Sequence, residues 1–320
     1  MMNIPKLPLG DWIDTFIDFL VNQFERSFEE IAEGLEYIVE YMVDSLLTGP
    51  NFIFILAATV IAWSVGRWKF GLPAFFLSIL LEVFILDAPI TVLILSFTAL
   101  AWWSGKWKFG LFTLIGLLLI LNLGYWEEMI ETLSLVIASV IITVAVGIPV
   151  GILASQSEKI RRIVTPVLDF MQTMPAFVYL LPAIFFFNIG VVPGIIASVI
   201  FAMPPAIRLT ILGIRQVSGE LIEATQAFGS TTTQKLLKVQ LPLAMPSIMA
   251  GINQSIMLSL SMVVIASMVG APGLGAEVYR AVTQLQIGAG FEAGISIVVI
   301  AIILDRLTQN IGSKNRGGNL

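Results

Sequence analysis

The fold of this chain is decided by one stretch, TLSLVIASVIITVAVGIPVGILA, which runs from Thr132 to Ala154. It carries no charged residue, and glycine and proline occur only towards its end. A helix needs about 20 mostly apolar residues to cross roughly 30 Å of hydrocarbon, so this stretch is long enough to span a membrane. We therefore predict a transmembrane helix here.

Similar apolar stretches recur along most of the chain. Nine candidate spans lie at 51–66, 71–86, 89–104, 109–123, 132–154, 163–187, 192–213, 246–269 and 293–309. The first few are short, so tilted, re-entrant or interfacial helices stay open for them. The predicted fold class is an all-α polytopic membrane protein with about seven to nine transmembrane helices and an amphipathic N-terminal segment.

The composition excludes several classes of function. Of the 320 residues, 57% are hydrophobic and 12% are charged, and the mean hydropathy is +0.93, which is too apolar for a soluble domain. The chain has no Cys and no His, so it lacks thiolate or imidazole metal sites and the common nucleophile pairs of enzymes. With a net charge of −5 and no basic arm, it is predicted to bind no nucleic acid.

An acidic segment precedes the apolar stretches. Residues 11–47 hold ten carboxylates and a single base, Arg26. Apolar residues recur there at three- and four-residue steps, from Ile13 to Leu46, and this spacing lines one face of a helix. We predict that residues 1–50 form one or two amphipathic helices that lie on the membrane surface and do not span it.

Positive charges indicate the orientation, because Lys and Arg of short loops stay in the cytoplasm. Alternating the nine spans places 14 of the 17 bases on one side of the membrane. We assign that side to the cytoplasm, so the acidic segment lies outside the cell and the tail, residues 312–320, lies inside. The chain is thus predicted to be a multi-pass protein of the cytoplasmic (inner) membrane, in contact with membrane lipid.

A repeat at an offset of 39 residues marks the segment 51–124. Residues 62–63 and 66–72 match residues 101–102 and 105–111. We interpret the segment as duplicated transmembrane hairpins, whose Trp and Lys residues anchor the helix ends at the membrane interface.

The longest polar interval between the late spans runs from Ile214 to Ala244. The distribution of positive charges places this interval in the cytoplasm. Ser218 is placed to cap a short helix, and Gly229 to end it with a left-handed residue. Thr231 and Gln234 then form a capping box for a second helix, which Pro242 is expected to end. The predicted structure is a helix, a glycine corner and a second helix, lying across the membrane surface.

This interval resembles the EAA motif of ABC importer permeases, in which Glu-Ala-Ala is followed after three residues by Gly and after nine more by Ile-x-Leu-Pro. The chain has Glu223-Ala224-Thr225, then Gly229, then Val239-Gln240-Leu241-Pro242 at the same spacings, with Thr225 and Val239 as mild departures. The resemblance implies that residues 214–244 are the coupling loop that docks on the ATP-hydrolysing subunit. Its predicted coupling residues are Glu220, Glu223, Ala224, Thr225, Ala227, Phe228, Gly229, Leu241 and Pro242.

The resemblance also implies the partners. The chain has no G-x-x-x-x-G-K-[ST] phosphate loop, so ATP and Mg are expected on a separate ATP-binding subunit in two copies. The chain itself is then no enzyme and holds no cofactor or metal. Two ATP-binding subunits imply a second permease copy, most simply in a homodimer.

Further stretches narrow the resemblance to the glycine betaine/proline betaine (osmoprotectant) branch. They are Leu168–Tyr179, Phe201–Thr210, Ala250–Ser255, Ala266–Gly275 and Leu304–Gln309, within a type I permease core predicted at 125–311. This implies import of glycine betaine, or a related quaternary ammonium or proline-type osmolyte, by alternating access from an extracellular substrate-binding protein. Candidates for an external gate or a contact with that protein are Gly273, Gly275 and Glu277.

Polar residues inside the spans have two interpretations. Because such groups are costly in a membrane, they either hydrogen-bond between helices or line the path of the substrate. The candidates for the translocation path are Gln172, Thr173, Pro175, Phe177, Tyr179, Asn253, Gln254, Ser255 and Ser259. Pro175 and Pro182 are expected to break the hydrogen-bond ladder of the sixth span, and Pro204 and Pro205 that of the seventh, and the freed carbonyls would suit a passage.

The alternative function is an ion- or proton-coupled secondary transporter of small zwitterions. It needs titratable pairs inside the membrane or a complete inverted repeat. Asp169 and Asp305 instead lie near cytoplasmic span ends, and the repeat covers only the early hairpins. A third possibility, an intramembrane enzyme, lacks a catalytic His or Cys.

Overall fold

The computed structural model describes residues 9–47, 88–105 and 107–314, and this part of the chain is built from helices without a strand. Its elements are α1 (Leu9–Leu47), α4 (Ala88–Gly105), α5 (Trp107–Leu123), α6 (Trp126–Gln156), α7 (Glu158–Thr173), η1 (Ala176–Tyr179), α8 (Leu180–Phe187), α9 (Val191–Arg215), α10 (Gly219–Ala227), α11 (Thr232–Lys235), η2 (Leu236–Gln240), α12 (Leu241–Ser267), α13 (Leu274–Thr283) and α14 (Ile287–Lys314). The predicted spans at 51–66 and 71–86, and with them the first copy of the repeat, lie outside the described residues.

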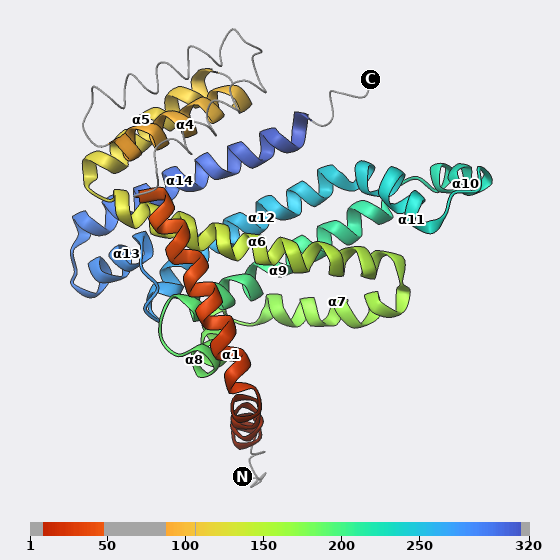
Figure 1. Ribbon diagram of the computed structural model, residues 1–320, viewed down its shortest axis with the longest axis horizontal. Helices are drawn as coiled ribbons and strands as arrows, with labels where there is room; N and C mark the ends of the chain where they lie inside the picture. Colours follow the sequence, from red (N-terminus) through yellow and green to blue (C-terminus); the bar gives the residue numbers. More distant parts are fainter. Residues whose placement is uncertain (1–8, 48–87, 106, 315–320) are drawn as a thin grey trace, which may run out of the picture.

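Four long apolar helices form the centre of the fold (Figure 1). Within the described ranges, α6, α9, a continuous helix from Thr232 to Ser267, and α14 are each long and apolar enough to cross a membrane. α9 packs against both α6 and α12, and α14 packs against α12. The shorter apolar helices α4 and α5 pack against each other and against α14. The all-α polytopic fold predicted from the sequence is confirmed.

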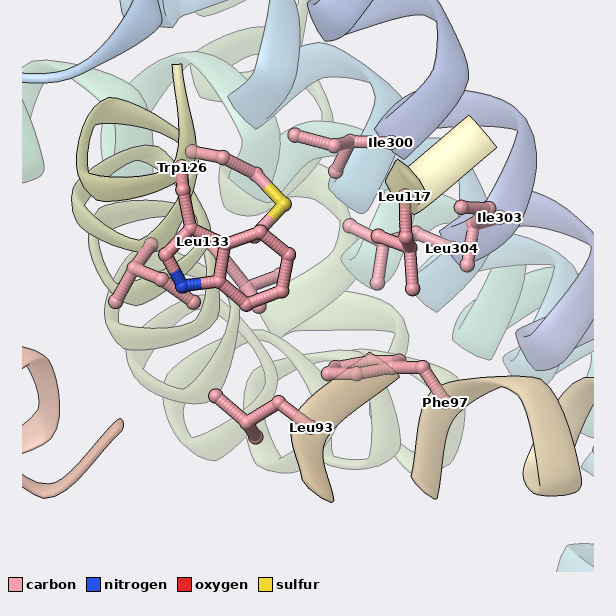
Figure 2. Close-up of a pocket in the computed structure, with 10 residues that line it drawn as sticks. Leu93, Phe97, Leu117, Trp126, Leu133, Ile300, Ile303 and Leu304 are labelled. Atoms are coloured by element: carbon pink, nitrogen blue, oxygen red, sulfur yellow. The ribbon is translucent and has the colours of Figure 1, made fainter. Parts of the chain in front are cut away.

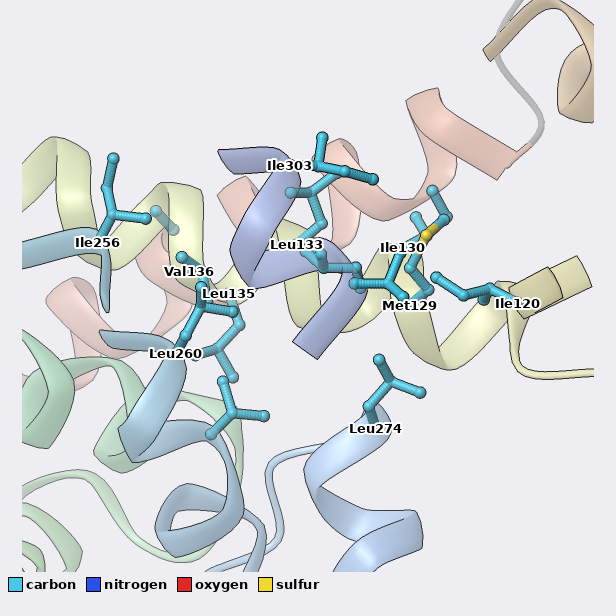
Figure 3. Packing of buried hydrophobic residues seen from close by; sticks show 14 of the residues in the cluster. Ile120, Met129, Ile130, Leu133, Leu135, Val136, Ile256, Leu260, Leu274 and Ile303 are labelled. Atoms are coloured by element: carbon cyan, nitrogen blue, oxygen red, sulfur yellow. The ribbon is translucent and has the colours of Figure 1, made fainter. Parts of the chain in front are cut away.

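Small residues let α9 and α12 approach closely. A β-carbon at Gly213 would lie 2.7 Å from Ser247 Cβ, and one at Gly251 would lie 3.1 Å from Pro205 O. Close backbone contact of this kind is what holds helices together in lipid, where no hydrophobic force acts between them. Elsewhere large aliphatic side chains fill the core, as between α6, α13 and α14 in Figure 3.

The sixth predicted span, 163–187, is not one straight helix. α7 ends at Thr173, and the chain bends by 111° before η1 and α8. Pro175 explains the bend, because proline has no N–H to continue the helix and keeps Met174 extended, with φ −72° and ψ 137°. The break predicted at Pro175 is therefore confirmed. The break predicted at Pro182 is wrong, because this proline lies in the first turn of α8, where it is tolerated.

Pro204 and Pro205 remove hydrogen bonds from the ladder of the seventh span, but they do not end the helix. α9 runs as one helix from Val191 to Arg215, and both prolines are buried. α12 packs closely on this turn, and its Ser255 Oγ donates to Ala202 O at 2.7 Å. Pro204 and Pro205 leave the carbonyls of Ile200 and Phe201 without their usual N–H donors, and the bond from Ser255 goes to the next carbonyl, so α12 packs directly on this weakened turn.

The described part of the acidic segment forms α1, in which two helical parts meet at a kink at Phe24. In Figure 1 it crosses α6, with which it is in contact, at a steep angle. Val39 is buried in the main core, and the Phe28 ring packs on Phe186 and Phe187 of α8, at centroid distances of 4.6 and 5.6 Å. The predicted helical character is confirmed, and the position of α1 on the outer membrane surface stays a prediction.

Candidate functional site

The first helix of the coupling loop is capped at both ends as predicted. Ser218 Oγ accepts an N–H of the first turn of α10 at 3.4 Å. At the other end Gly229 is left-handed, with φ +76°, and its N–H donates to Gln226 O at 2.9 Å. The next N–H, that of Ser230, donates to Thr225 O at 3.1 Å, which completes a Schellman motif. The glycine therefore ends α10 and turns the chain sharply.

The second helix begins as predicted but does not end at Pro242. The Gln234 N–H donates to Thr231 Oγ1 at 3.2 Å, and the Thr231 N–H donates to Gln234 Oε1 at 3.0 Å. α11 then continues through the wide π turn η2 into α12, so one helix runs from Thr232 to Ser267. Pro242 lies in the first turn of α12, where the π turn accommodates a residue without an N–H. The coupling loop is thus continuous with a membrane span.

The surface of α10 is open to a partner. Glu220, Glu223, Ala224 and Ala227 are all exposed, and Phe228, directly after the helix, is 91% exposed. Figure 1 shows α10 and α11 projecting from one end of the molecule. A bare phenylalanine among alanines is the arrangement of an anchor that fills a pocket on another protein.

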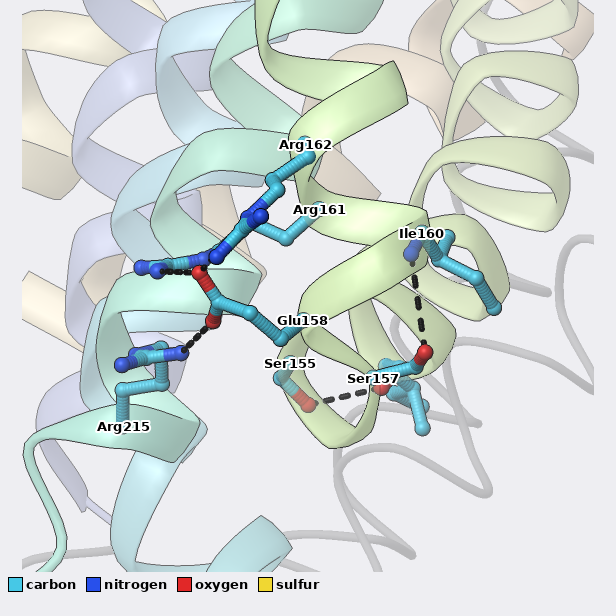
Figure 4. A network of polar contacts seen from close by, with 8 residues as sticks. Ser155, Ser157, Glu158, Ile160, Arg161, Arg162 and Arg215 are labelled. Atoms are coloured by element: carbon cyan, nitrogen blue, oxygen red, sulfur yellow. Dashed lines mark hydrogen bonds and ion pairs between the residues drawn. The ribbon is translucent and has the colours of Figure 1, made fainter.

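Two polar contacts hold the helix ends next to the coupling loop, and sequence reasoning missed both. Gln156 Nε2, at the end of α6, donates to Gln240 Oε1 of η2 at 3.1 Å. Glu158, at the start of α7, forms an ion pair with Arg215, the last residue of α9, at 3.5 Å, in addition to a local one with Arg161 within α7 (Figure 4). Gln156 and Gln240 are 84 positions apart and Glu158 and Arg215 are 57, so no local pattern predicts either contact.

Of the predicted path residues on α12, some bond to neighbouring helices or are buried, and one is exposed. Asn253 hydrogen-bonds to two side chains of α14, and Ser255 donates to a carbonyl of α9. Ser259 is buried, whereas Gln254 is exposed. For Asn253 and Ser255 the structure favours the interpretation as hydrogen bonds between helices.

The other path candidates lie at the bend between α7 and α8. Gln172, Thr173, Pro175 and Phe177 are exposed. Tyr179 is buried, and its hydroxyl donates to a carbonyl of α7 across the bend. The exposed side chains are therefore the ones available to a solute, while Tyr179 stabilises the bend.

The crevice between α4, α5, α6 and α14 does not suit a polar solute. Its lining is aliphatic and aromatic, and includes Leu93, Phe97, Trp126 and Ile300 (Figure 2). A zwitterion there would lose its hydration without gaining partners, which is strongly unfavourable. Among the described residues, no group of acidic side chains is arranged to hold a metal ion.

The predicted outer turn is packed against the bundle. Gly273 has φ +105°, and a β-carbon there would lie 2.5 Å from Thr132 Oγ1. The same hydroxyl accepts the Leu274 N–H at 2.8 Å and so joins α13 to α6. Gly275 is buried as well, and Glu277 forms an ion pair within α13. Both glycines have a packing role, and contact of this turn with a binding protein stays a prediction.

Comparisons with known proteins agree with this geometry. The family model described as "Binding-protein-dependent transport system inner membrane component" matches residues 147–317. The glycine betaine transport system permease protein OpuAB of Bacillus subtilis is 57% identical, over 99% of this chain and 98% of its own length. The glycine betaine/carnitine transport permease protein GbuB of Listeria monocytogenes is 50% identical, over 98% of this chain and 99% of its own length.

Solved structures agree as well. An inward-facing structure of the MetNI methionine ABC transporter contains a chain that is 25% identical, with a TM-score of 0.53 over 60% of this chain and 95% of that one. The type I importer fold implied by the EAA resemblance is therefore confirmed. On these grounds the chain belongs to the family of inner membrane components of binding-protein-dependent transport systems.

Proposed function

We propose that this chain is the permease subunit of an ATP-driven ABC importer that carries glycine betaine, or a related quaternary ammonium or proline-type osmolyte, into the cell. Relatives named for glycine betaine transport match nearly its whole length. The observation that carries the proposal is the coupling loop, an exposed helix, glycine and helix with EAA spacing, continuous with α12. The relatives are permease proteins, so the chain is a transport subunit and not an enzyme.

An ABC importer permease works with an ATP-binding subunit and a substrate-binding protein. In this proposal two ATP-binding subunits, which hold ATP and Mg, bind the coupling loops of two permease copies in a homodimer. Phe228 is the apolar anchor of each loop, because its ring is almost wholly exposed. Gly229 beside it has no side chain, so the main chain of the partner can approach closely.

The placement of the elements supports the proposed orientation. The coupling loop, together with the Glu158 ion pairs, lies at one end of the molecule and α13 lies at the other (Figure 1). Of the described bases assigned to the cytoplasm, Arg161, Arg162, Arg215, Lys235 and Lys238 lie at the first end. The outer end, with Glu277 on α13, then meets the binding protein, and the N-terminal segment lies outside the cell.

The translocation path is proposed to run between the two permease copies. Gln172, Thr173, Phe177 and Gln254 are exposed on a single copy, so their side chains are free to face a passage that the second copy completes. An aromatic face suits a trimethylammonium group, which has no N–H to donate.

The secondary transporter gains no support from these observations. Asp169 forms an ion pair with Arg208, and Asp305 is hydrogen-bonded by Asn253, so both carboxylates already have structural partners. The relatives are named as parts of transport systems, in keeping with a separate ATP-binding subunit.

ATP-dependent uptake tests the proposed function. The chain is reconstituted in lipid vesicles with its ATP-binding subunit, ATP is enclosed, and the binding protein is added outside with labelled glycine betaine, carnitine, choline or proline. We expect accumulation of glycine betaine that requires both ATP and the binding protein. Accumulation driven by a proton or sodium gradient without ATP would instead establish the secondary transporter.

The substitution Phe228→Ala is expected to weaken binding of the ATP-binding subunit about 30-fold, because an aromatic interface anchor contributes about 2 kcal/mol or more. Binding is measured by titrating the solubilised permease with the ATP-binding subunit. Leu285→Ala is the matched control, because Leu285 is 86% exposed but lies between α13 and α14 at the outer end. Equal affinity of the two variants would remove Phe228 from the proposed interface.

A further inference from the structure

A cluster of polar side chains joins α12 to α14. Asn253 Nδ2 donates to Asp305 Oδ1 at 2.7 Å, and Thr308 Oγ1 donates to Asn253 Oδ1 at 2.5 Å. Gln309 Nε2 donates to the same Asp305 oxygen at 2.7 Å. Asn253, Asp305 and Thr308 are each partly buried. Both polar ends of one amide on α12 are therefore held by α14.

The chemistry of the partners sets the direction of these bonds. An ionised carboxylate only accepts hydrogen bonds, so the amide nitrogen of Asn253 must face Asp305. The amide oxygen then faces the Thr308 hydroxyl, whose one proton has this oxygen as its nearest acceptor, ahead of the carbonyl oxygens of Leu304 at 2.8 Å and Asp305 at 3.0 Å. A flipped amide would place its oxygen against the carboxylate, so the pair has a single satisfied arrangement.

Apolar packing already holds the two helices together. Ile256 of α12 and Ile303 of α14 are buried in the main core, and Ile252, Leu304 and Leu307 pack against it. Aliphatic contacts are not directional, whereas a hydrogen bond is lost once donor and acceptor separate beyond roughly 3.5 Å. Apolar packing therefore holds α12 and α14 together, and the polar cluster fixes their position relative to each other along the helix axes.

The cluster is placed where it can transmit motion from α12 to α14. α12 is continuous with the coupling loop, so it receives any motion of that loop directly. α14 packs against α13, at the opposite end of the molecule. The cluster thus lies between α12, the helix that is driven, and α14, and both of these helices contact α13 at the outer end.

We propose that Asn253 and Asp305 form a latch that makes α14 follow α12 when the coupling loop moves. The proposal rests on the importer function proposed above, and it makes both side chains positioning residues that do not contact the solute. When the latch is broken, α12 moves past α14, and α14 no longer contributes to the change that ATP hydrolysis drives at the outer end of the permease.

Exchange of the two side chains tests the latch in the complete importer. Asn253→Asp alone places two carboxylates face to face, and we expect the ratio of solute imported to ATP hydrolysed to fall about tenfold, within the usual range of coupling between sites. Asn253→Asp combined with Asp305→Asn restores a carboxylate and an amide with reversed polarity, and Thr308 can still donate to position 253. We expect the double variant to recover the ratio.

Control variants distinguish coupling from folding. Ser261→Ala removes a hydroxyl of α12 that, among the described residues, bonds within its own helix, to Met257 O at 3.0 Å, and we expect it to leave the ratio unchanged. Asn253→Leu breaks the latch without adding charge, and it is measured too, in case Asn253→Asp does not assemble. We expect it to lower the ratio as well.

Two results would overturn the latch. One is a parallel loss of uptake and hydrolysis in Asn253→Asp and Asn253→Leu with an unchanged ratio, which is the result of a purely structural role. The other is a double variant that stays as uncoupled as the single one. Uptake by the unaltered chain is measured first. If the unaltered chain imports no solute with ATP, the importer function itself is refuted, and the variants are not compared.

Discussion

Replacement of Gly229 by aspartate is expected to reduce ATP-driven uptake on the order of a hundredfold, while the chain still folds and inserts. Gly229 has φ +76°, and no atom of the described chain lies within 4 Å of the position that a β-carbon would take. A side chain there strains the main chain and obstructs the surface offered to the ATP-binding subunit, but it meets nothing else. Uptake by reconstituted vesicles and the amount of chain in the membrane are the two measurements.

Two further substitutions at this position separate obstruction from strain. Gly229→Asn adds bulk with a residue that tolerates the left-handed conformation, whereas Gly229→Ala adds strain with little bulk. If obstruction dominates, Gly229→Asn is the more damaging of the two. Gly288→Asp is the control for insertion and for binding of the ATP-binding subunit, because Gly288 also has no neighbour within 4 Å but lies at the start of α14, away from the coupling loop. Normal uptake by Gly229→Asp would count against the role of the coupling loop.

Gly275→Ala is expected to prevent stable folding. Its β-carbon would lie 2.4 Å from Val263 O and 2.7 Å from Val263 C, which are main-chain atoms of α12 and cannot rotate away. We expect the free energy of unfolding to fall by about 3 kcal/mol or more, the upper part of the range for overfilling a packed core. The fraction of monodisperse protein after solubilisation, and its Tm, report this loss.

Gly294→Ala is the control for this prediction. Gly294 lies within α14, and no atom lies within 4 Å of the place that its β-carbon would occupy, so alanine fits there. Alanine favours a helix over glycine by about 1 kcal/mol, and we expect a Tm equal to or above that of the unaltered chain. An unchanged Tm in Gly275→Ala would show that α13 can move away from α12. It would then favour the earlier prediction that this turn acts as an external gate or contacts the binding protein.

The coupling loop was predictable because its determinants are local. Ser218, Thr231 and Gln234 each bond to a group within three residues along the chain, and Gly229 is recognisable from its conformational freedom. Interactions of this range are visible in a sequence as spacings. Only the end of the second helix was predicted wrongly, because the π turn that accommodates Pro242 has no residue signature.

The path candidates were less predictable because polar residues within spans have partners that the sequence does not indicate. Asn253 was a candidate for the path, and the structure pairs it with Asp305, 52 positions away. Gly275 was a candidate for contact with the binding protein, and the structure buries it against the main chain of α12. Both outcomes depend on which helices lie side by side.

By itself, the sequence determined that this chain is a helical membrane protein, where α6, α9, α12 and α14 lie along it, and how the coupling loop is capped. The sequence also indicated the break at Pro175, but only the tertiary structure decided that the chain bends there by 111°, that α9 stays helical through its two prolines, and that α14 is joined to α12. The physical reason is range: hydropathy and capping act within a few residues, whereas the outcome at a proline or a polar group in a membrane depends on what the neighbouring helix supplies.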